Sequence, residues 1–377
     1  MTKFLKGRPT RSDIDHAALR WNLRQIQKKI GPRVKILSMV KANAYGHGAV
    51  AVARTLAKSG SDAFGVATVE EGIELRDSRI KQPILVLAGA YVEQLDELLE
   101  YKLTPVLHDS ATLTAFERKA RRRKIKLNFQ LEVDTGMGRI GFPSAEIEAW
   151  LTTLAKLKAL KLAGVFSHFS EAESANEKYA AKQLKTFQRV LDRLNEVGIV
   201  QAPAHMSKSA ALITTPAANF SMVRPGLILY GMYPAANLKK QISLKPVLAW
   251  KTRIIQLKRA PIGTSIGYGR TFVTKRNSLI ATLPVGYADG YRRLLSNRAQ
   301  VLVRGKRVPV VGRVSMDLTT VDVTDIRNVQ QGDEVVLLGR QGGGEISADE
   351  MAAWADTISY EIFTSIGARV PRIHINQ

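Results

Sequence analysis

Residues 34–48 read VKILSMVKANAYGHG. Its apolar first half predicts a buried strand that ends directly before Lys41. The small residues, glycines and Tyr45 that follow lead into a helix expected to begin near Gly48, whose free N–H groups attract anions such as phosphate. A lysine amine condenses with an aldehyde only when neutral, and burial beside other cations lowers its pKa toward that state. An aldehyde together with a phosphate indicates pyridoxal phosphate; the alternative is a lysine that snorkels from a strand end above a glycine turn.

The composition restricts the class of protein. The 377 residues are 45% hydrophobic and 24% charged, so the chain is globular and long enough for two domains. Cysteine is absent and only six histidines occur, which excludes a disulfide framework and a cysteine nucleophile and leaves no expected metal site. Residues 1–9 lack the apolar core of a signal peptide, and no apolar run is long enough to span a bilayer. We therefore expect a cytoplasmic protein with no membrane partner.

The basic composition raises nucleic-acid binding as a second class of function. Lysine and arginine total 56 against 33 acidic residues, a net charge of +23, and basic surfaces bind phosphate polymers through counterion release. The charges are spread along the chain, however, and the densest cluster, at 118–126, falls where a helix is expected to end before a strand. No zinc-finger spacing or RNA-binding aromatic motif accompanies it. We expect a solvated basic surface and no nucleic-acid partner.

The first two thirds of the chain alternate between short apolar runs and amphipathic stretches. An opening helix is predicted at 15–30, and the clearest later helix at 178–197. Eight strands are predicted at 34–40, 63–67, 84–88, 104–107, 126–134, 162–167, 203–206 and 220–223. Eight parallel strands that alternate with helices describe a closed (β/α)8 TIM-like barrel, which we assign to residues 1–243.

Polar side chains follow several of these strands at the end where such barrels place their chemistry. They are Lys41, residues 134–139, His168, residues 207–209 and Arg224. Five independent polar groups on one rim are hard to explain by packing, so this rim is the expected site.

Residues 244–377 are expected to form a mainly antiparallel β domain. Strands are predicted at 247–256, 278–285, 301–310 and 334–338, with a hairpin turn at Gly305. This region contains three tyrosines that a purely structural interpretation does not predict: Tyr268, Tyr287 and Tyr360. Glycines flank the first two and are expected to leave their side chains accessible. Each alone is more often a packing tyrosine, but as a set beside a rim lysine they are candidates for acid–base chemistry.

The sequence resembles the bacterial alanine racemases, pyridoxal-phosphate enzymes with a barrel followed by a β domain. The resemblance covers nearly the whole chain. Three segments carry it most specifically: VKANAYGHG at 40–48, VDTGMGR at 133–139 and VRPGL at 223–227. Further similar segments are SKSAA at 207–211, GYG at 267–269, GYADG at 286–290, SMD at 315–317 and ISYE at 358–361.

The resemblance implies a role for each matching residue. Lys41 would hold the cofactor and serve as one catalytic base, with Tyr268 as the second. Arg139 and Met316 would bind the substrate carboxylate, Arg224 the pyridine nitrogen, and His168 the ring. The phosphate would be held by Tyr45, Ser209, Gly226, Leu227 and Tyr360, with Tyr287 and Asp317 in supporting positions. It also implies a head-to-tail homodimer with shared active sites, acting on a small amino acid to supply D-alanine for peptidoglycan.

The chemistry agrees with these roles. Racemisation removes a proton from one face of the substrate Cα and returns one to the other, which calls for two acid–base groups. Tyrosine ordinarily loses its proton near pH 10, so Tyr268 needs cationic neighbours such as Arg139 and His168. Arg224 can only donate to the ring nitrogen, and the weakened electron sink favours racemisation over transamination.

Three other classes of protein share all or part of this architecture, and the sequence separates them from an alanine racemase to different extents. Related amino-acid decarboxylases typically carry an acidic residue at the ring nitrogen and a cysteine near the substrate, whereas this chain has Arg224 and no cysteine. Small pyridoxal-phosphate carrier proteins resemble the barrel alone and would not need residues 244–377. A broader-specificity or serine racemase is the alternative that the sequence separates least well.

Three positions depart from the family pattern. Glu132 stands where many relatives have a carbamylated lysine, Lys208 where they have asparagine, and Ser315 where cysteine is common. We interpret Glu132 as a built-in negative charge that orients Arg139; an ordinary strand glutamate facing solvent is the alternative.

Overall fold

The structure is a computed structural model that describes residues 7–173, 178–199 and 203–377. Its contacts divide the chain into two compact units. One comprises Ala18–Ala44 and Ala49–Lys245, here called the barrel unit; the other comprises the described part of Met1–Ala17 with Tyr45–Gly48 and Pro246–Gln377, here called the β-rich unit. No helix within the described ranges is long and apolar enough to cross a membrane.

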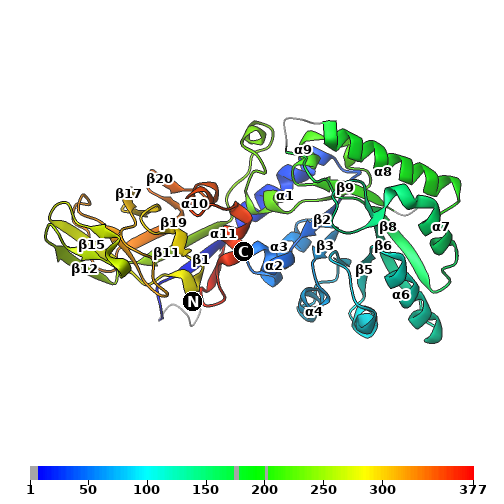
Figure 1. The fold of residues 1–377 in the computed structure, drawn as a ribbon, viewed down its shortest axis with the longest axis horizontal. Coiled ribbons are helices and arrows are strands. Elements are labelled where there is room, and N and C mark those ends of the chain that lie inside the picture. The colour runs from blue at the N-terminus through cyan, green and yellow to red at the C-terminus, as the bar shows by residue number, and fades with distance from the viewer. Residues whose placement is uncertain (1–6, 174–177, 200–202) are drawn as a thin grey trace. The chain divides into compact units, whose positions relative to one another are not determined.

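The barrel unit is a closed ring of eight parallel strands, as predicted (Figure 1). Its strands are β2 (Lys35–Met39), β3 (Ala63–Val66), β4 (Ile84–Val86), β5 (Leu103–Leu107), β6 (Leu127–Asp134), β8 (Leu160–Phe166), β9 (Ala204–Lys208) and β10 (Met222–Arg224). Strand β2 pairs with both β3 and β10, and the pairing of β5 with β6 closes the ring. A two-residue strand, β7 (Phe142–Pro143), adds to β6 and was not predicted.

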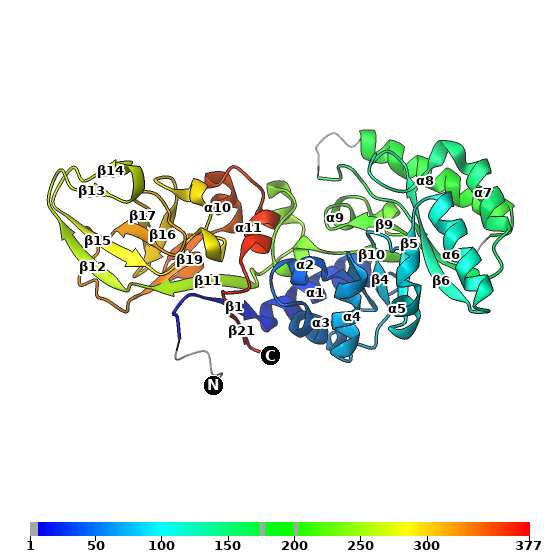
Figure 2. The same ribbon diagram turned by 60° about the horizontal axis from the view of Figure 1, so that its bottom comes forward.

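Helices surround the outside of the ring (Figure 2), and the strands' own side chains fill its inside, so most strand residues are buried. The helices are α1 (His16–Ile30), α3 (Ala49–Lys58), α4 (Val69–Asp77), α5 (Leu95–Glu100), α6 (Ser110–Arg122), α7 (Ile147–Ala155), α8 (Lys178–Glu196) and α9 (Ala211–Thr214). The predicted helices at 15–30 and 178–197 are confirmed within a residue. Helix α6 ends inside the basic cluster at 118–126, where cations suit the helix carbonyl end.

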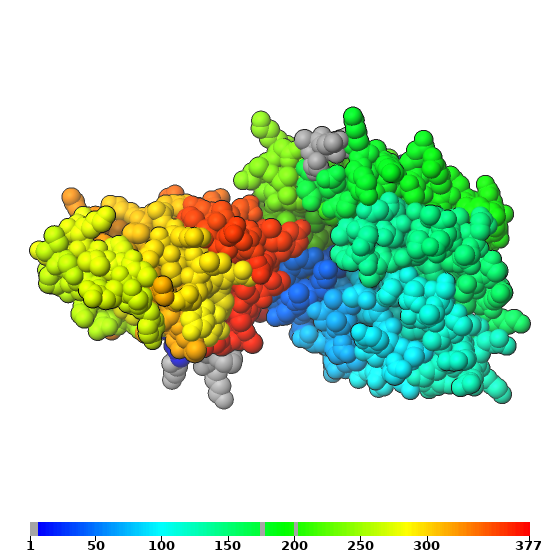
Figure 3. Space-filling view, viewed as in Figure 1, coloured from blue at the N-terminus to red at the C-terminus, as the bar shows by residue number. Residues whose placement is uncertain are grey.

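The β-rich unit is built on a mainly antiparallel sheet in the order β17-β16-β19-β11-β1-β21, with β20 paired to β19. These strands are β1 (Arg11–Asp15), β11 (Leu248–Arg253), β16 (Gln300–Val303), β17 (Lys306–Pro309), β19 (Glu334–Gln341), β20 (Gly344–Ile346) and β21 (Arg372–Ile375). Smaller sheets are formed by β12 (Gln256–Ala260), β15 (Ser278–Leu283) and β18 (Thr319–Asp322), and by β13 (Ser265–Ile266) and β14 (Phe272–Val273). Helices α10 (Ala348–Trp354) and α11 (Ser359–Ser365) follow. The C-terminal residues of this unit, yellow to red in Figure 3, form one continuous body.

Two strand predictions in the β-rich unit have different outcomes. The hairpin at Gly305 is confirmed: Val303 pairs with Lys306, and Arg304 and Gly305 adopt φ values of 52° and 77°, the left-handed pair that a tight hairpin needs. The single strand predicted at 247–256 is wrong. The chain leaves the main sheet after Arg253 and begins a strand of a different sheet at Gln256. The sequence of residues 247–256 gives no sign of this break between the two sheets.

Candidate active site

Lys41 begins a left-handed turn, α2 (Lys41–Tyr45), at the carboxyl end of β2. Ala42, Asn43, Ala44 and Tyr45 have φ values between 51° and 53°. Non-glycine residues rarely adopt this conformation, and four in succession are costly. Such strain persists only where the surroundings enforce it, and it clusters at functional sites.

Three hydrogen bonds enforce the turn. The Ala44 N–H donates to the Val40 carbonyl at 2.8 Å, the Ala42 N–H to the Glu71 carboxylate at 2.6 Å, and the Ala49 N–H to the Asn43 side chain at 2.8 Å. The last bond ties the turn to the first residue of α3 and fixes the direction in which the chain leaves Lys41.

The amine of Lys41 is electrostatically prepared for condensation with a carbonyl. Burial lowers its pKa, and the charges of Arg139 and Arg224 lower it further, against the opposing influence of Glu71 and Glu132. A lowered pKa increases the fraction of neutral, nucleophilic amine.

Arg224 is a buried cation at the end of β10, held on several sides. Its guanidinium donates to the Ser167 carbonyl at 2.7 Å, the Met206 carbonyl at 3.1 Å and His205 Nδ1 at 2.5 Å. The guanidinium carbon lies 4.9 Å from the Phe166 ring centre. Burial lowers the Arg224 pKa to about 10, so the group stays protonated at neutral pH and can only donate hydrogen bonds.

The support behind Arg224 was missed by sequence reasoning. His205 Nε2 lies 2.8 Å from Gln130 Oε1, and its ring stacks on Phe166 at 4.9 Å between centres. Burial holds the His205 pKa well below its ordinary value, with the Arg224 charge adding to the effect. Nε2 therefore donates to Gln130, leaving Nδ1 free to accept from Arg224. The available signal was polar Gln130 and His205 inside apolar strands.

His168 lies next to the same guanidinium, with Nδ1 3.3 Å from an Arg224 nitrogen. Burial lowers its pKa well below the ordinary value, and Arg224 and Arg139 act in the same direction. The imidazole is therefore neutral at physiological pH and offers an uncharged face to a flat ring.

Glu132, on β6, is buried, with 4% of its surface exposed. This contradicts the alternative of a strand glutamate facing solvent. Burial raises its pKa to about 7, although the charges of Arg224 and Arg139 act to lower it. A pKa of about 7 means that Glu132 changes its charge near neutral pH. The positive charge of Arg139, the predicted substrate-binding arginine, acts on this carboxyl group.

Arg139 is exposed at the end of a loop organised by Asp134. One Asp134 carboxylate oxygen accepts from the N–H groups of Gly136 and Met137 at 2.8 Å each and of Gly138 at 3.2 Å. Three donors on one oxygen fix the loop while leaving the Arg139 side chain accessible.

Ser209 and Gly226 meet where β9 and β10 end side by side. The Gly226 N–H donates to the Ser209 hydroxyl oxygen at 2.9 Å, and Leu227 begins a short 3-10 helix, Leu227–Tyr230. Lys208, the unusual neighbour, is paired with Glu173 at 3.0 Å. These strand ends bring hydroxyl and N–H groups together, the donors that a phosphate requires.

The remaining predicted residues belong to the β-rich unit. Tyr45 is buried and packs on Tyr360 with 5.9 Å between ring centres; burial raises its pKa, so it stays a hydroxyl donor. Tyr268 is 72% exposed in a turn where Gly267 and Gly269 have positive φ, which confirms the accessibility expected from its flanking glycines. Tyr287 and Met316 are also exposed. Asp317 is paired with Arg369.

The structure therefore brings together the predicted residues of the barrel unit, whereas those of the β-rich unit share that unit without all meeting in one place. The first set is Lys41, Glu132, Arg139, His168, Ser209, Arg224, Gly226 and Leu227; the second is Tyr45, Tyr268, Tyr287, Met316, Asp317 and Tyr360. The first set fits pyridoxal phosphate: an amine of lowered pKa, a buried cation beside a neutral imidazole, and phosphate donors on adjacent strand ends.

Comparisons with known proteins agree with this fit. The sequence matches the family "Alanine racemase, N-terminal domain" over residues 14–234 and "Alanine racemase, C-terminal domain" over residues 247–374. It is 46% identical to an alanine racemase of Halothermothrix orenii over 370 residues, 98% of each chain.

Solved structures match over nearly the whole chain. An alanine racemase of Clostridium difficile superimposes with a TM-score of 0.92 at 35% identity, covering 98% of this chain and 97% of the other. An alanine racemase of Bartonella henselae with covalently bound pyridoxal phosphate matches with a TM-score of 0.87 at 29% identity, covering 98% of this chain and all of the other.

Proposed function

Because the chain belongs to the alanine racemase family, a family of isomerases, we propose that it interconverts L-alanine and D-alanine with pyridoxal phosphate attached to Lys41. The observation that carries this proposal is the Lys41 amine, whose pKa is lowered on a strained turn beside two arginine charges. The purpose of the reaction would be to supply D-alanine for peptidoglycan.

Residues of this chain would hold the cofactor at three points. Lys41 would bind its aldehyde carbon, Arg224 would donate to the ring nitrogen, and the neutral imidazole of His168 would contact the ring. Ser209, Gly226 and Leu227 of the barrel unit, and Tyr45 and Tyr360 of the β-rich unit, would each contribute to holding the phosphate. When bound, the cofactor supplies an electron sink that acidifies the substrate Cα.

Two residues exchange the proton. The Lys41 amine serves one face of the substrate Cα and the Tyr268 hydroxyl the other, so each direction of the reaction uses the same pair in opposite order. Arg139 and Met316 hold the substrate carboxylate, which keeps the Cα–H bond aligned with the two bases. An exposed Tyr268 in the second unit fits a site completed by a partner subunit, and we propose a homodimer with shared sites.

Arg224 determines the type of reaction. Its pKa of about 10 and its carbonyl and imidazole partners keep it a hydrogen-bond donor at neutral pH, so it would leave a bound ring nitrogen without a proton. The cofactor would then be a weaker electron sink, and a proton removed from the substrate Cα would be returned to Cα. This favours racemisation over transamination and separates the chain from decarboxylases with an acidic residue at this point.

A direct assay tests the function. Purified protein with pyridoxal phosphate is incubated with L-alanine, L-serine, L-lysine or L-arginine, and the D-enantiomer is measured by chiral chromatography. Rapid formation of D-alanine supports the proposal. Faster racemisation of serine would favour the serine racemase alternative, and no D-amino acid from any substrate would refute the function.

A further inference from the structure

The loop that carries Tyr287 and the loop that carries Met316 are joined into one piece. The Tyr287 N–H donates to the Ser315 carbonyl and the Ala288 N–H to the Met316 carbonyl, each at 3.0 Å. A Cβ on Gly286 would lie 2.3 Å from the Ser315 oxygen, so only glycine allows this approach. Any movement of one loop must therefore displace the other.

Asp289, in the first of these loops, is the anchor of the piece. Its side chain is fully buried. One oxygen accepts from the Gly286 N–H at 3.0 Å, and both oxygens accept from Arg8 at 2.5 Å each. Arg369 adds a contact at 2.9 Å from its Nε. Bidentate guanidinium pairs of this kind fix orientation as well as supplying attraction.

Arg369 connects the anchor to the second loop. A terminal nitrogen of the same guanidinium lies 2.6 Å from Asp317, the residue after Met316. Two arginines and two aspartates thus form a chain, Arg8–Asp289–Arg369–Asp317, whose formal charges cancel. A network of hydrogen-bonded groups whose charges balance holds each of those groups in place.

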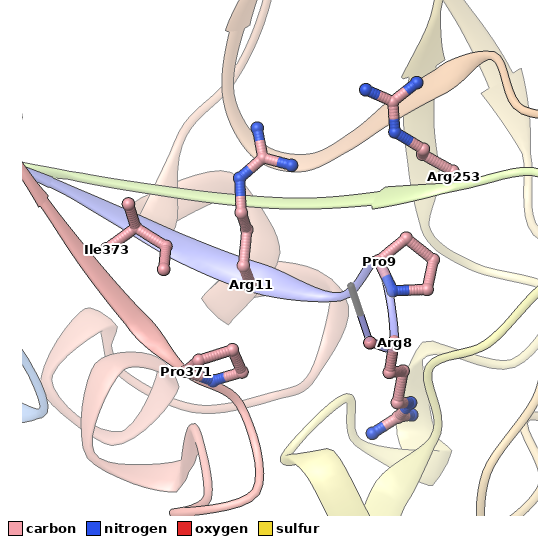
Figure 4. Close-up of a pocket in the computed structure, with 7 residues that line it drawn as sticks. Arg8, Pro9, Arg11, Arg253, Pro371 and Ile373 are labelled. Carbon is pink, nitrogen blue, oxygen red and sulfur yellow. The ribbon is translucent and has the colours of Figure 1, made fainter. Parts of the chain in front are cut away.

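Arg8 belongs to this network and not to an arginine cluster nearby. It lines a pocket of about 230 Å³ together with Arg11 and Arg253, but its side chain points away from their guanidinium groups (Figure 4). Besides Asp289, it donates to the Pro284 carbonyl at 2.5 Å. The hydrogen bonds of its guanidinium therefore go to residues 284–289. Through them, Arg8 links the N-terminal segment to the loop that carries Tyr287.

We propose that Arg8, Asp289 and Arg369 are positioning residues for racemisation, which hold Tyr287 and Met316 in the geometry needed at the substrate carboxylate. This inference rests on the proposed function, since it takes Met316 as a substrate contact. The three residues do not touch substrate; they act through the two joined loops.

The test compares Arg8→Gln, Asp289→Asn and Arg369→Gln in the cofactor-loaded enzyme. Arg276→Gln is the matched control, because it removes an exposed two-point pair with Asp325, at 3.0 and 2.6 Å, in the same unit. For each protein we would measure kcat and KM for L-alanine, cofactor absorbance, borohydride labelling and melting temperature. The conservative Arg8→Lys and Arg369→Lys variants are measured in parallel.

We expect KM for alanine to rise by about tenfold to a hundredfold, the scale of a contact displaced by about 1 Å, with cofactor loading unchanged. The lysine variants should recover part of the loss, because they restore charge without the two-point geometry. If Asp289→Asn does not fold, the glutamine and lysine variants of Arg8 and Arg369 test the positioning role without it.

Two results would overturn the positioning role: KM values equal to those of Arg276→Gln, or a parallel loss of cofactor, kcat and melting temperature that marks a merely structural role. Failure of the proposed function is distinguishable, because the unmodified enzyme would then make no D-alanine at all.

Discussion

The most quantitative prediction concerns Glu132→Gln and the dependence of stability on pH. Burial raises the pKa of Glu132 from an ordinary 4.5 to about 7, which corresponds to about 3 kcal/mol of free energy between its two protonation states. The folded pKa lies above the unfolded one, so the stabilising contribution is present below pH 4.5 and is lost as pH rises through 7. Between these values, Glu132 ionisation should lower the free energy of unfolding by up to about 3 kcal/mol.

Denaturant unfolding of the cofactor-free protein between pH 4.5 and 8 measures this slope. Glu132→Gln should remove most of it, while Glu146→Gln, at an exposed position of the same unit, should leave it unchanged. Equal slopes in the unmodified protein and Glu132→Gln would refute the assignment of a pKa near 7 to this carboxyl.

The same residue predicts a change in activity. The Arg139 charge acts on Glu132, so loss of the carboxylate should weaken the orientation of Arg139 and raise KM for alanine more than it disturbs cofactor binding. In the unmodified enzyme KM should rise as pH falls through 7, and Glu132→Gln should lose this dependence. Glu132→Lys should regain activity with bicarbonate, by forming the carbamate that relatives use. A Gln variant with an unchanged KM would exclude the role.

Two further predictions address the proton-transfer pair. Tyr268→Phe should keep bound cofactor but lose roughly 10² to 10⁴ in turnover, the scale of a positioned acid–base group, while deuterium exchange at Cα survives for the enantiomer whose proton faces Lys41; equal exchange of both enantiomers would contradict two separate bases. Mixing inactive Lys41→Ala and Tyr268→Ala proteins with verified subunit exchange should restore about a quarter of the sites if each site draws its lysine and tyrosine from different chains of a two-fold dimer; no recovered activity would assign both residues to one chain.

The barrel could be predicted because most of its strands are short, mainly apolar runs, and the helices between them show a different period. Strands β1 and β21 could not, because they are short and lie beside each other only after 356 intervening residues have folded. The sheet change after Arg253 was hidden for a similar reason: both strands continue one run, and their partners are remote in sequence.

At the site, sequence patterns predicted where the charged residues lie, but not the backbone conformation or the burial of the groups around them. Lys41 and Arg224 follow strands, which the sequence displays directly. The left-handed backbone from Ala42 to Tyr45 has no such signal, because alanine and tyrosine do not prefer positive φ and tertiary bonds impose it. The burial of Glu132 likewise depends on barrel closure, which no local pattern encodes.

The most direct test of the central claim is chemical trapping at Lys41. Purified protein loaded with pyridoxal phosphate should be yellow, and borohydride reduction followed by peptide mass analysis should place the cofactor mass on the peptide that contains Lys41. Lys41→Ala should lose racemisation while retaining some non-covalent cofactor through the phosphate contacts. A label on any other lysine would contradict the account at its foundation.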